Sequence, residues 1–328
     1  MQVTTKDIAR VCGISRGTVD RALNGKPRID PDTKALILKT AREMGYRPDL
    51  LARSLVKGRT MSLGVVVYDI RNRYFAQLVS AIEMAARRRG YFLNITLQEN
   101  DPEMESRLIG NLVDRRVDGL ILCPVNKGEE FRAFLKSLPA PSVVIGNYIA
   151  PDIPFAGIDE RAAAIDAVEL IASKGYERIV FVCPPLANAS KENIYSHEQR
   201  LAGFYEAIGR HAIASREVLG ADDYLDRLSP ILGASDARTA FFCSGDIYAL
   251  GAVRRLKAEG FEVPRDAGVM GFDNIDTLEY FTPSLATVGT PVSELGVLAV
   301  RTLLDLVDGK ETELRNLLDY SIIDGASL

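Results

Sequence analysis

Histidine and cysteine are scarce in this chain of 328 residues, which holds two histidines and four cysteines. The cysteines are Cys12, Cys123, Cys183 and Cys243. Their spacing is irregular and includes no C-x-x-C pair, so the pattern indicates neither a disulfide framework nor a zinc site. The last three each end a short apolar run, which predicts small buried residues at strand ends. With only His197 and His211 as imidazole ligands, we expect no metal and no other cofactor.

Long apolar runs are also missing. No stretch approaches the roughly 20 apolar residues that span a bilayer, and the polar N-terminus begins with a helix cap, unlike a signal peptide. We therefore expect a cytoplasmic protein with no membrane partner. Its content of 47% hydrophobic and 26% charged residues is ordinary for a globular chain. Its length suits two or three domains.

The motifs of common enzymes on α/β folds are absent as well. The sequence contains no G-x-S-x-G elbow that follows a strand, no Walker A loop and no G-x-G-x-x-G after its first apolar run. No histidine base paired with a nucleophile is evident. An enzyme on a doubly wound fold is therefore the disfavoured alternative, and we expect a protein that is not an enzyme.

The N-terminal segment VTTKDIARVCGISRGTVDRALN predicts two short helices joined by a glycine turn. Thr4 or Thr5 can cap the first helix, Gly13 suits the left-handed residue that ends it, and Ser15 can cap the second. Two such helices form a helix-turn-helix, whose second helix enters the major groove of DNA. The outward residues of that second helix are Arg16, Gly17, Asp20 and Arg21.

A third helix is predicted from about Pro31 to Met44, with Asp30 as its cap. Its apolar residues can pack under the first two helices, and they are Ala35, Ile37, Leu38 and Ala41. Charge supports a nucleic-acid module, because residues 1–60 carry 13 Lys and Arg against 6 Asp and Glu, whereas the remainder carries 27 against 38. A generic three-helix bundle with a solvated basic face is the alternative.

Residues 3–24 and 46–59 resemble the N-terminus of the lactose-repressor (LacI/GalR) family of bacterial regulators. The matching stretches are KDIA, G-I-S, TV-R-LN, GYRP and LLARSL, which are specific in combination. The resemblance implies that Arg16, Gly17 and Arg21 read bases. Arginine can pair with guanine through two hydrogen bonds, which contributes roughly 1–3 kcal/mol of discrimination.

The resemblance also implies contacts to the DNA backbone and a hinge. The residues that fall where the family touches phosphates are Thr4, Ser15, Thr18 and Asn24. Leu55 matches the hinge-helix leucine that wedges into the minor groove, and Ala52 lies beside it.

Asp20 departs from the family, which usually has serine before the recognition arginine. Its carboxylate can hold Arg16 or Arg21 in one rotamer, since pairing four residues apart is available on a helix. It can also accept from cytosine N4, or stay solvated as a bystander. We favour the pairing and leave the other two interpretations open.

From Ser62 onward, short apolar runs alternate with helical patterns, which predicts βαβ units and parallel sheets. The pattern restarts after SVVIGN, so we expect an α/β body of two doubly wound lobes. This part resembles the family's core, which is similar to periplasmic sugar-binding proteins. The resemblance implies a helix-turn-helix head at 1–47, a hinge helix and linker at 48–60, an N-terminal effector lobe at 61–158 plus 289–322, and a C-terminal effector lobe at 159–288.

Ligands of doubly wound sheets bind outside the carboxyl ends of the strands, so two facing lobes predict a cleft. Polar and aromatic candidates follow the predicted strands, namely Asp69, Asn72, Arg73, Tyr74, Phe75, Asn147, Arg200, Asp246 and Asp273. Such groups suit a polyhydroxylated small molecule. The candidates that match the family's effector contacts are Tyr74, Phe75, Asn147, Arg200 and Asp273. Asp246 lies in a loop where the family also contacts its effector, next to Gly245, where some relatives have the contacting asparagine.

Structural roles remain open for these candidates. Asp69 and Asn72 can cap the following helix, Phe75 can be interlobe core, Arg200 can be a surface residue and Asp273 can form a turn.

Arg73 stands where the family commonly has proline. Together with Arg200, and with Lys191 in a nearby loop, it predicts a cleft with two or three cations, which would suit carboxylate or phosphate. An acidic effector, either a sugar acid or a sugar phosphate, therefore stands beside a neutral sugar as an open alternative.

These features together predict a ligand-responsive transcription regulator, and the resemblance implies a repressor. Two heads on a symmetric homodimer would bind a palindromic operator in double-stranded DNA. The sequence ends in IIDGASL without leucine heptads, so we expect a dimer and no tetramerising tail. A sugar-binding module whose head no longer reads DNA is the remaining alternative.

Overall fold

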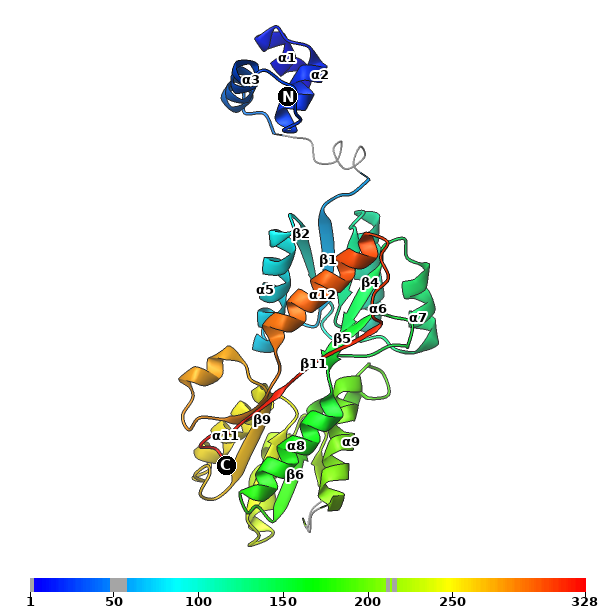
Figure 1. Ribbon diagram of the computed structural model, residues 1–328. Helices are drawn as coiled ribbons and strands as arrows, with labels where there is room; N and C mark the ends of the chain where they lie inside the picture. The colour runs from blue at the N-terminus through cyan, green and yellow to red at the C-terminus, as the bar shows by residue number, and fades with distance from the viewer. Residues whose placement is uncertain (1–2, 48–57, 211–212, 214–216) are drawn as a thin grey trace. The chain divides into compact units, whose positions relative to one another are not determined.

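The computed structural model describes residues 3–47, 58–210, 213 and 217–328 in two compact units, residues 1–60 and residues 61–328 (Figure 1). The first unit contains α1 (Thr5–Cys12), α2 (Arg16–Leu23) and α3 (Pro31–Glu43). Thr4 is the residue before α1, Gly13 ends α1 with a φ of 66°, and the Asp30 carboxylate accepts from Thr33 N at 2.9 Å. The predicted helix-turn-helix is therefore confirmed.

The core of the three-helix unit consists of Ile8, Val19, Ala22, Ile37 and Ala41. The prediction that Ala35 packs inward is wrong, because Ala35 is exposed. It lies two residues before Ile37, and because two residues span about 200° of an α-helix, Ala35 points away from the face that Ile37 buries. Thr40 is buried on the inner face of α3.

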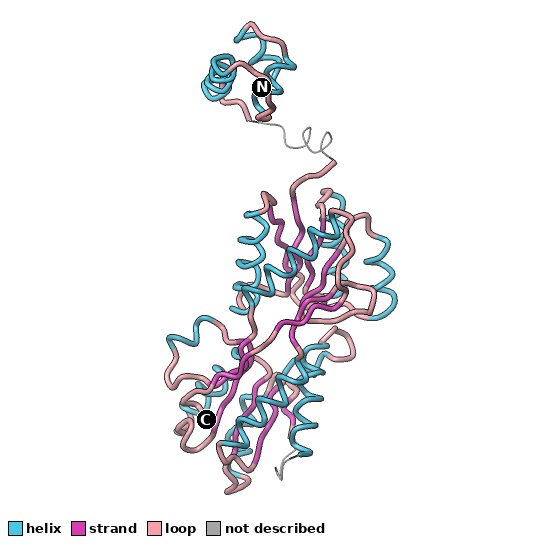
Figure 2. The backbone as a smooth tube through the Cα atoms, viewed as in Figure 1, coloured by secondary structure: helices cyan, strands magenta, loops and turns pink. Residues whose placement is uncertain are grey.

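The second unit is a pair of α/β lobes (Figure 2). The first lobe has a parallel sheet in the order β11-β5-β4-β3-β1-β2. Its strands are β1 (Ser62–Val67), β2 (Phe92–Leu97), β3 (Gly119–Leu122), β4 (Ser142–Ile145), β5 (Phe155–Ile158) and β11 (Arg315–Leu318). Its helices are α5 (Arg73–Arg88), α6 (Pro102–Asp114), α7 (Gly128–Ser137) and α12 (Val292–Val307).

The second lobe repeats this architecture in the order β12-β10-β9-β8-β6-β7, in which β12 alone pairs antiparallel. Its strands are β6 (Arg178–Val182), β7 (Val218–Leu219), β8 (Thr239–Cys243), β9 (Gly268–Asp273), β10 (Ala286–Gly289) and β12 (Ser321–Ile323). Its helices are α8 (Glu160–Ser173), η1 (Pro184–Asn188), α9 (Tyr195–Arg210), α10 (Tyr224–Gly233), α11 (Asp246–Ala258) and η2 (Asp276–Tyr280).

Helices cover both faces of each sheet, as a doubly wound fold requires. In the first lobe, α5 and α12 share one apolar core, and α6 and α7 share the other. In the second lobe, α8 and α9 pack on one face, and α10 and α11 pack on the opposite face. The predicted fold of two doubly wound parallel-sheet lobes is confirmed.

The chain passes between the lobes more than once. It enters the second lobe after β5, returns at α12 after β10, and crosses again between β11 and β12 (Figure 1). The pairing of β12 with β10 places residues 321–323 in the second sheet. Residues 321 and 322 belong to the range that the sequence assigned to the first lobe.

The three cysteines at predicted strand ends are buried, as expected. Cys123 follows β3, Cys183 follows β6, and Cys243 is the last residue of β8. No cluster of His, Cys, Asp and Glu side chains in the described parts of the chain has the arrangement of a metal site.

None of the helices among the described residues is both long enough and apolar enough to span a bilayer.

Candidate functional site

The helix predicted to read DNA, α2, begins at a well-defined cap. The Ser15 hydroxyl accepts from Thr18 N at 3.2 Å and lies 2.9 Å from the Thr18 hydroxyl. Arg16 and Gly17 are exposed in the first turn. A Cβ at Gly17 would have only the Ser15 hydroxyl within contact distance, at 3.9 Å, so packing does not require glycine there. The bare backbone leaves room for close approach of another molecule.

Asp20 lies beside Arg16, as the favoured interpretation predicted. Arg16 Nε is 3.7 Å from the Asp20 carboxylate and donates to the Thr5 hydroxyl at 3.3 Å. Arg21 instead donates to the Pro27 carbonyl at 3.2 Å. The two arginines are therefore oriented by different partners within the head.

The other predicted DNA contacts take part in local hydrogen bonds. The Thr4 hydroxyl and backbone N–H both donate to Asp7, which lowers the pKa of that carboxyl. The Asn24 amide donates to the Asp20 carbonyl at 2.7 Å. The predicted hinge contacts Ala52 and Leu55 lie outside the described residues.

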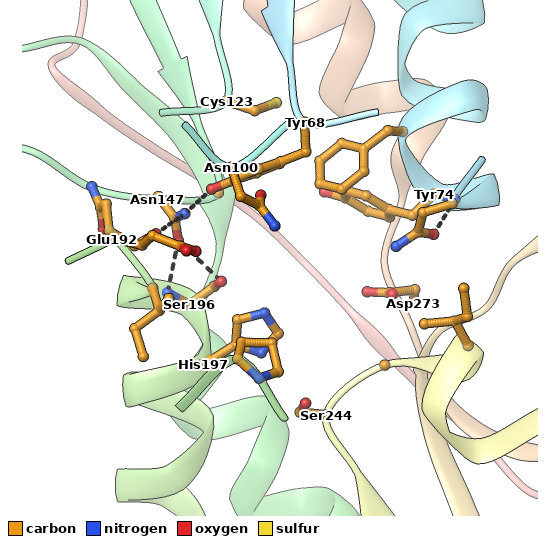
Figure 3. Close-up of a pocket in the computed structure, with 18 of the residues that line it drawn as sticks. Tyr68, Tyr74, Asn100, Cys123, Asn147, Glu192, Ser196, His197, Ser244 and Asp273 are labelled. Atoms are coloured by element: carbon orange, nitrogen blue, oxygen red, sulfur yellow. Dashed lines mark hydrogen bonds between the residues drawn. The ribbon is translucent and has the colours of Figure 1, made fainter. Parts of the chain in front are cut away.

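A cavity of about 430 Å³ lies between the two lobes of the body (Figure 3). It is lined where β1, β4, β8 and β9 end and where α5 and α9 begin. Of the predicted effector contacts, the cavity is lined by Asp69, Asn72, Tyr74, Phe75, Asn147, Arg200 and Asp273. These residues come from positions more than 200 apart in the sequence, because both sheets direct their carboxyl ends to the same cleft.

Asn147 borders the cavity, but both ends of its amide already have partners. Its Nδ2 lies 3.1 Å from the Pro124 carbonyl and 2.6 Å from the Asn193 carbonyl, and it also contacts the Tyr68 hydroxyl. Its Oδ1 accepts from the backbone N–H and the hydroxyl of Ser196, each at 3.1 Å. Asn147 therefore connects the first lobe to the second.

Arg200 is buried, so the surface alternative does not hold for it. Its Nε donates to Glu160 at 2.8 Å, another nitrogen donates to the Ser244 carbonyl, and Nη2 lies 3.8 Å from Asp273. The guanidinium carbon also sits 3.5 Å from the centre of the Phe272 ring. Burial raises the pKa of both Glu160 and Asp273, and the Arg200 charge opposes that shift.

Asn72 caps α5 at the edge of the cavity, and Asp69 holds the turn that precedes it. Asp69 Oδ1 accepts from Arg71 N at 2.7 Å and Asn72 N at 2.9 Å, and Asn72 Oδ1 accepts from Tyr74 N at 3.1 Å. The capping alternative is therefore present for Asn72 and not for Asp69, and both residues also line the cavity.

Three aromatic rings form one wall of the cavity. The Tyr68 and Phe75 ring centres are 4.9 Å apart, and Tyr74 meets Phe75 edge to face at 5.1 Å. Phe75 also packs against the first lobe's core. Such a wall suits the apolar face of a ring-shaped ligand.

Arg73 does not line the cavity, in contrast to the prediction. Its guanidinium forms a two-pronged ion pair with Asp276 of η2, with one Nε–Oδ1 distance of 2.9 Å. Asp276 N also lies 3.2 Å from the Gln77 side chain of α5. This ion pair across the lobes keeps Arg73 out of the cavity. Lys191, the other predicted cation, is exposed and does not line the cavity either.

Asp246 is also absent from the cavity lining, because it faces inward beneath the β9 loop. Its carboxylate accepts from the Thr287 hydroxyl at 2.6 Å and from Ile275 N at 2.9 Å. Burial raises its pKa to about 6. A Cβ at Gly271 would collide with this carboxylate, and the loop it supports contains Asp273 at a φ of 113°. Asp246 thus positions a predicted contact.

Several residues that line the cavity were not predicted, including Tyr68, Glu160, Asn193, Ser196, His197 and Tyr248. For two of them, the sequence contained a signal that could have identified them. Tyr68 directly precedes Asp69 at the end of β1, and His197 stands one helical turn before Arg200, on the same face. Asn193 lacked any such signal, because it lies in a loop.

Two family models match the chain. The model of bacterial regulatory proteins of the lacI family matches residues 4–49, and a periplasmic binding protein-like domain matches residues 168–328. Catabolite control protein A of Priestia megaterium is 31% identical, over 98% of this chain and 96% of its own length. The transcriptional repressor CytR of Escherichia coli K12 is 30% identical, over 94% and 90%.

A solved lac repressor dimer, bound to operator and the anti-inducer ONPF, has the same fold, with a TM-score of 0.88 and 23% identity over 100% of this chain and 99% of that one. The helix-turn-helix and the two-lobed body therefore define a DNA-binding transcription regulator. The chain belongs to the lacI family of bacterial regulatory proteins. Because these relatives are regulators, the enzyme alternative is set aside.

Proposed function

We propose that this protein is a homodimeric transcriptional repressor that binds a palindromic operator and responds to a small polyhydroxylated ligand. The observation that carries the proposal is that one chain joins a helix-turn-helix to a ligand-sized cavity between two lobes. Repression is supported by the names of relatives such as the repressor CytR. A regulator of bacterial transcription would act in the cytoplasm.

The head would read the operator through the exposed side of α2. Arg16, Gly17 and Arg21 would meet base edges, while Asp20 holds Arg16 in place. Phosphates would be contacted by Thr4, Ser15, Thr18 and Asn24. Ala52 and Leu55 would form the minor-groove hinge. We propose the division 1–47, 48–60, 61–158 plus 289–322, and 159–288 for head, hinge and lobes, except that residues 321 and 322 belong to the second lobe's sheet.

Exposed apolar side chains support the dimer. Met84 on α5, Phe92 and Ile95 on the edge strand β2, and Tyr280 at η2 are all exposed, with Phe92 at 78% and Tyr280 at 83%. Tyr280 borders a shallow groove on α11 and η2 that also includes Leu250 and Phe281. A second copy of the chain would cover these side chains symmetrically.

The cavity would couple the ligand to the DNA. A ligand shifts a protein between two states only through its different affinity for each of them. Contacts that cross the cleft, such as Asn147 with Ser196 and Arg73 with Asp276, would form in closed lobes and break in open ones. We propose that ligand binding changes lobe closure and thereby the spacing of the paired heads.

Selection from fragmented genomic DNA of the source tests the function directly. The purified protein should retain a near-palindrome, with affinity that falls steeply with salt because phosphate contacts release counterions. The neighbouring genes would then nominate ligands. If no fragment is enriched, with or without candidate sugars and sugar phosphates, the head does not read DNA and a binding module becomes the better interpretation.

Arg21→Ala should lower operator affinity by roughly 1–3 kcal/mol and relax specificity at one base position. The control is Lys39→Ala, at an exposed α3 residue paired with Glu43, which should leave specificity unchanged. Binding would be measured against operator variants at each position. Equal weakening on every sequence would make Arg21 a phosphate contact instead.

A further inference from the structure

His197 projects into the cavity from the first turn of α9, close to Ser244 and opposite Tyr68 and Asn100 (Figure 3). Its Nδ1 atom is buried and has no hydrogen-bond partner among the residues that the structure describes. A buried polar atom without a partner costs roughly 1–3 kcal/mol, and folded proteins rarely leave one unsatisfied. The imidazole lines the cavity, so a turn of the ring would present this nitrogen to a bound ligand, which would then supply the missing partner.

The neighbouring polar side chains of the cavity are less available to a ligand than His197, because they already hydrogen-bond to other parts of the protein. Asn147 joins the lobes through both ends of its amide. Asn193 donates to the Asn126 and Tyr148 carbonyls at 3.1 and 3.2 Å, and it accepts from Tyr195 N. The Tyr68 hydroxyl donates to the Pro124 carbonyl at 2.9 Å.

The charges around the cavity disfavour an anionic ligand. Among the described lining residues, the carboxylates are Asp69, Glu160, Glu192 and Asp273, and the guanidiniums are Arg71 and Arg200. Each guanidinium already has a carboxylate partner, Asp69 for Arg71 and Glu160 for Arg200. Lys127 and Lys191 lie near Glu192 and offset its charge, but they do not line the cavity.

His197 itself is a neutral group in this cavity. Burial lowers its pKa to about 3, and the Arg200 charge acts in the same direction. A neutral imidazole offers one N–H donor and one acceptor nitrogen. A hydroxyl group is likewise both donor and acceptor, so it complements a neutral imidazole. A ligand phosphate or carboxylate would instead be repelled by the carboxylates that line the cavity, and each lining guanidinium is already paired with one of them.

We infer that His197 is a specificity-determining ligand contact, and that the ligand is an uncharged molecule with vicinal hydroxyls, whose ring packs on the Tyr68, Tyr74 and Phe75 wall. The inference rests on the proposed function and narrows it, because it decides between the acidic and neutral alternatives. Asp273 would accept from a second hydroxyl, since none of the described residues hydrogen-bonds to its carboxylate and Arg200 Nη2 lies 3.8 Å away.

The test uses the full chain and a probe panel in matched pairs. Neutral pentoses, hexoses and disaccharides are compared with their phosphates and uronic acids, and nucleosides are compared with their monophosphates, since vicinal hydroxyls occur on both sugars and nucleosides. Thermal shift identifies binders, because a ligand that binds only the folded state raises Tm, and calorimetry then measures Kd. We expect a neutral probe to bind at least tenfold more tightly than its anionic partner.

Variants then isolate His197. His197→Phe keeps a ring but removes both nitrogens, and should weaken the best neutral probe about tenfold, the effect of losing one hydrogen bond. His197→Asn, which keeps a donor and an acceptor near the Nδ1 position, should recover part of that affinity. Glu198→Gln, at the exposed neighbouring position on α9, should bind as the wild type does. Without ligand, His197→Phe should be at least as stable as the wild type.

The failures are distinguishable. If only an anionic probe binds, the ligand class is wrong and the proposed function stands. If a neutral probe binds His197→Phe as tightly as the wild type, His197 is not a contact. If no probe in the panel shifts Tm, the proposed sugar-like ligand is itself wrong, and the inference is overturned with it.

Discussion

At the scale of single residues, proximity to the cavity does not decide what a side chain does there. Asn147 and His197 both line it, yet the Asn147 amide has partners at both ends, whereas His197 Nδ1 has none in the described part of the chain. Asp246, predicted as a contact, supports the loop that holds Asp273 instead. A side chain is available to a ligand only when the protein leaves its hydrogen-bonding capacity unused.

The shifted pKa of His197 predicts a pH dependence of stability. The folded-state pKa of about 3 lies below the unfolded value of 6.5. Between these values the unfolded chain binds a proton here and the folded chain does not, so His197 makes stability fall as pH drops through this window. Above about pH 7, His197 is neutral in both the folded and the unfolded chain, so it no longer makes stability depend on pH.

We therefore expect His197→Asn to lose less stability than the wild type between about pH 6.5 and pH 4, and to run parallel with it above pH 7. Urea unfolding followed by circular dichroism measures both curves. Asp246, whose raised pKa of about 6 acts in the opposite direction, is common to both proteins and cancels in the difference. Parallel curves throughout would show that His197 is protonated normally in the folded state.

At the scale of elements, the close packing of α8 on α9 depends on one glycine. A Cβ at Gly203 would collide with the Arg161 carbonyl and lie 2.9 Å from the Ala164 Cβ. Gly209, in the same helix, has no described residue within 4 Å of its Cβ position. The spacing of α8 and α9 matters for function because α9 carries both His197 and Arg200 to the cavity.

Gly203→Ala should destabilise the body by about 1–3 kcal/mol, because the added methyl group meets backbone rather than a movable side chain. The matched control Gly209→Ala should be neutral or stabilising by a few tenths to about 1 kcal/mol, since alanine is the better helix former. Thermal and urea unfolding would compare the two. Equal effects would mean that α8 and α9 separate readily to admit the methyl group.

At the scale of the whole body, polar contacts hold the lobes together on two sides of the cleft. Arg73 and Gln77 of α5 meet Asp276 of η2, and the Asn126 and Val125 backbones meet Asn193. The Arg73 and Asp276 side chains are 46% and 44% exposed, so solvent screens the pair and its contribution to stability is small. Its larger effect should be on the balance between closed and open lobes.

We expect Arg73→Asp to open the lobes, because it places two carboxylates together, and the double variant Arg73→Asp with Asp276→Arg to restore closure. Small-angle scattering of the three proteins would measure the change, which should shrink at high salt as screening increases. Arg73→Ala should change neutral-probe affinity only a few-fold. If Arg73→Ala instead lowers the affinity for anionic probes alone by tenfold or more, Arg73 contacts the ligand in the cavity.

Much of the fold was predictable from local pattern. The glycine at position 13, the caps Ser15 and Asp30, and the alternation of apolar runs with amphipathic stretches each specify a conformation within a few residues of themselves. The ends of parallel strands then share one edge, so seven of nine predicted effector residues line one cavity. The residue-level roles of these positions stay predictions.

The sequence by itself determined the secondary structure, the lobed architecture and the edge at which a ligand would bind, because each follows from short-range periodicity and turn chemistry. Tertiary structure alone decided which polar groups remain available there. Arg73 meets Asp276 from 203 residues away, and Asp246 meets Thr287 from 41 residues away. Competition for partners between distant segments depends on the folded arrangement, and spacing along the chain does not record it.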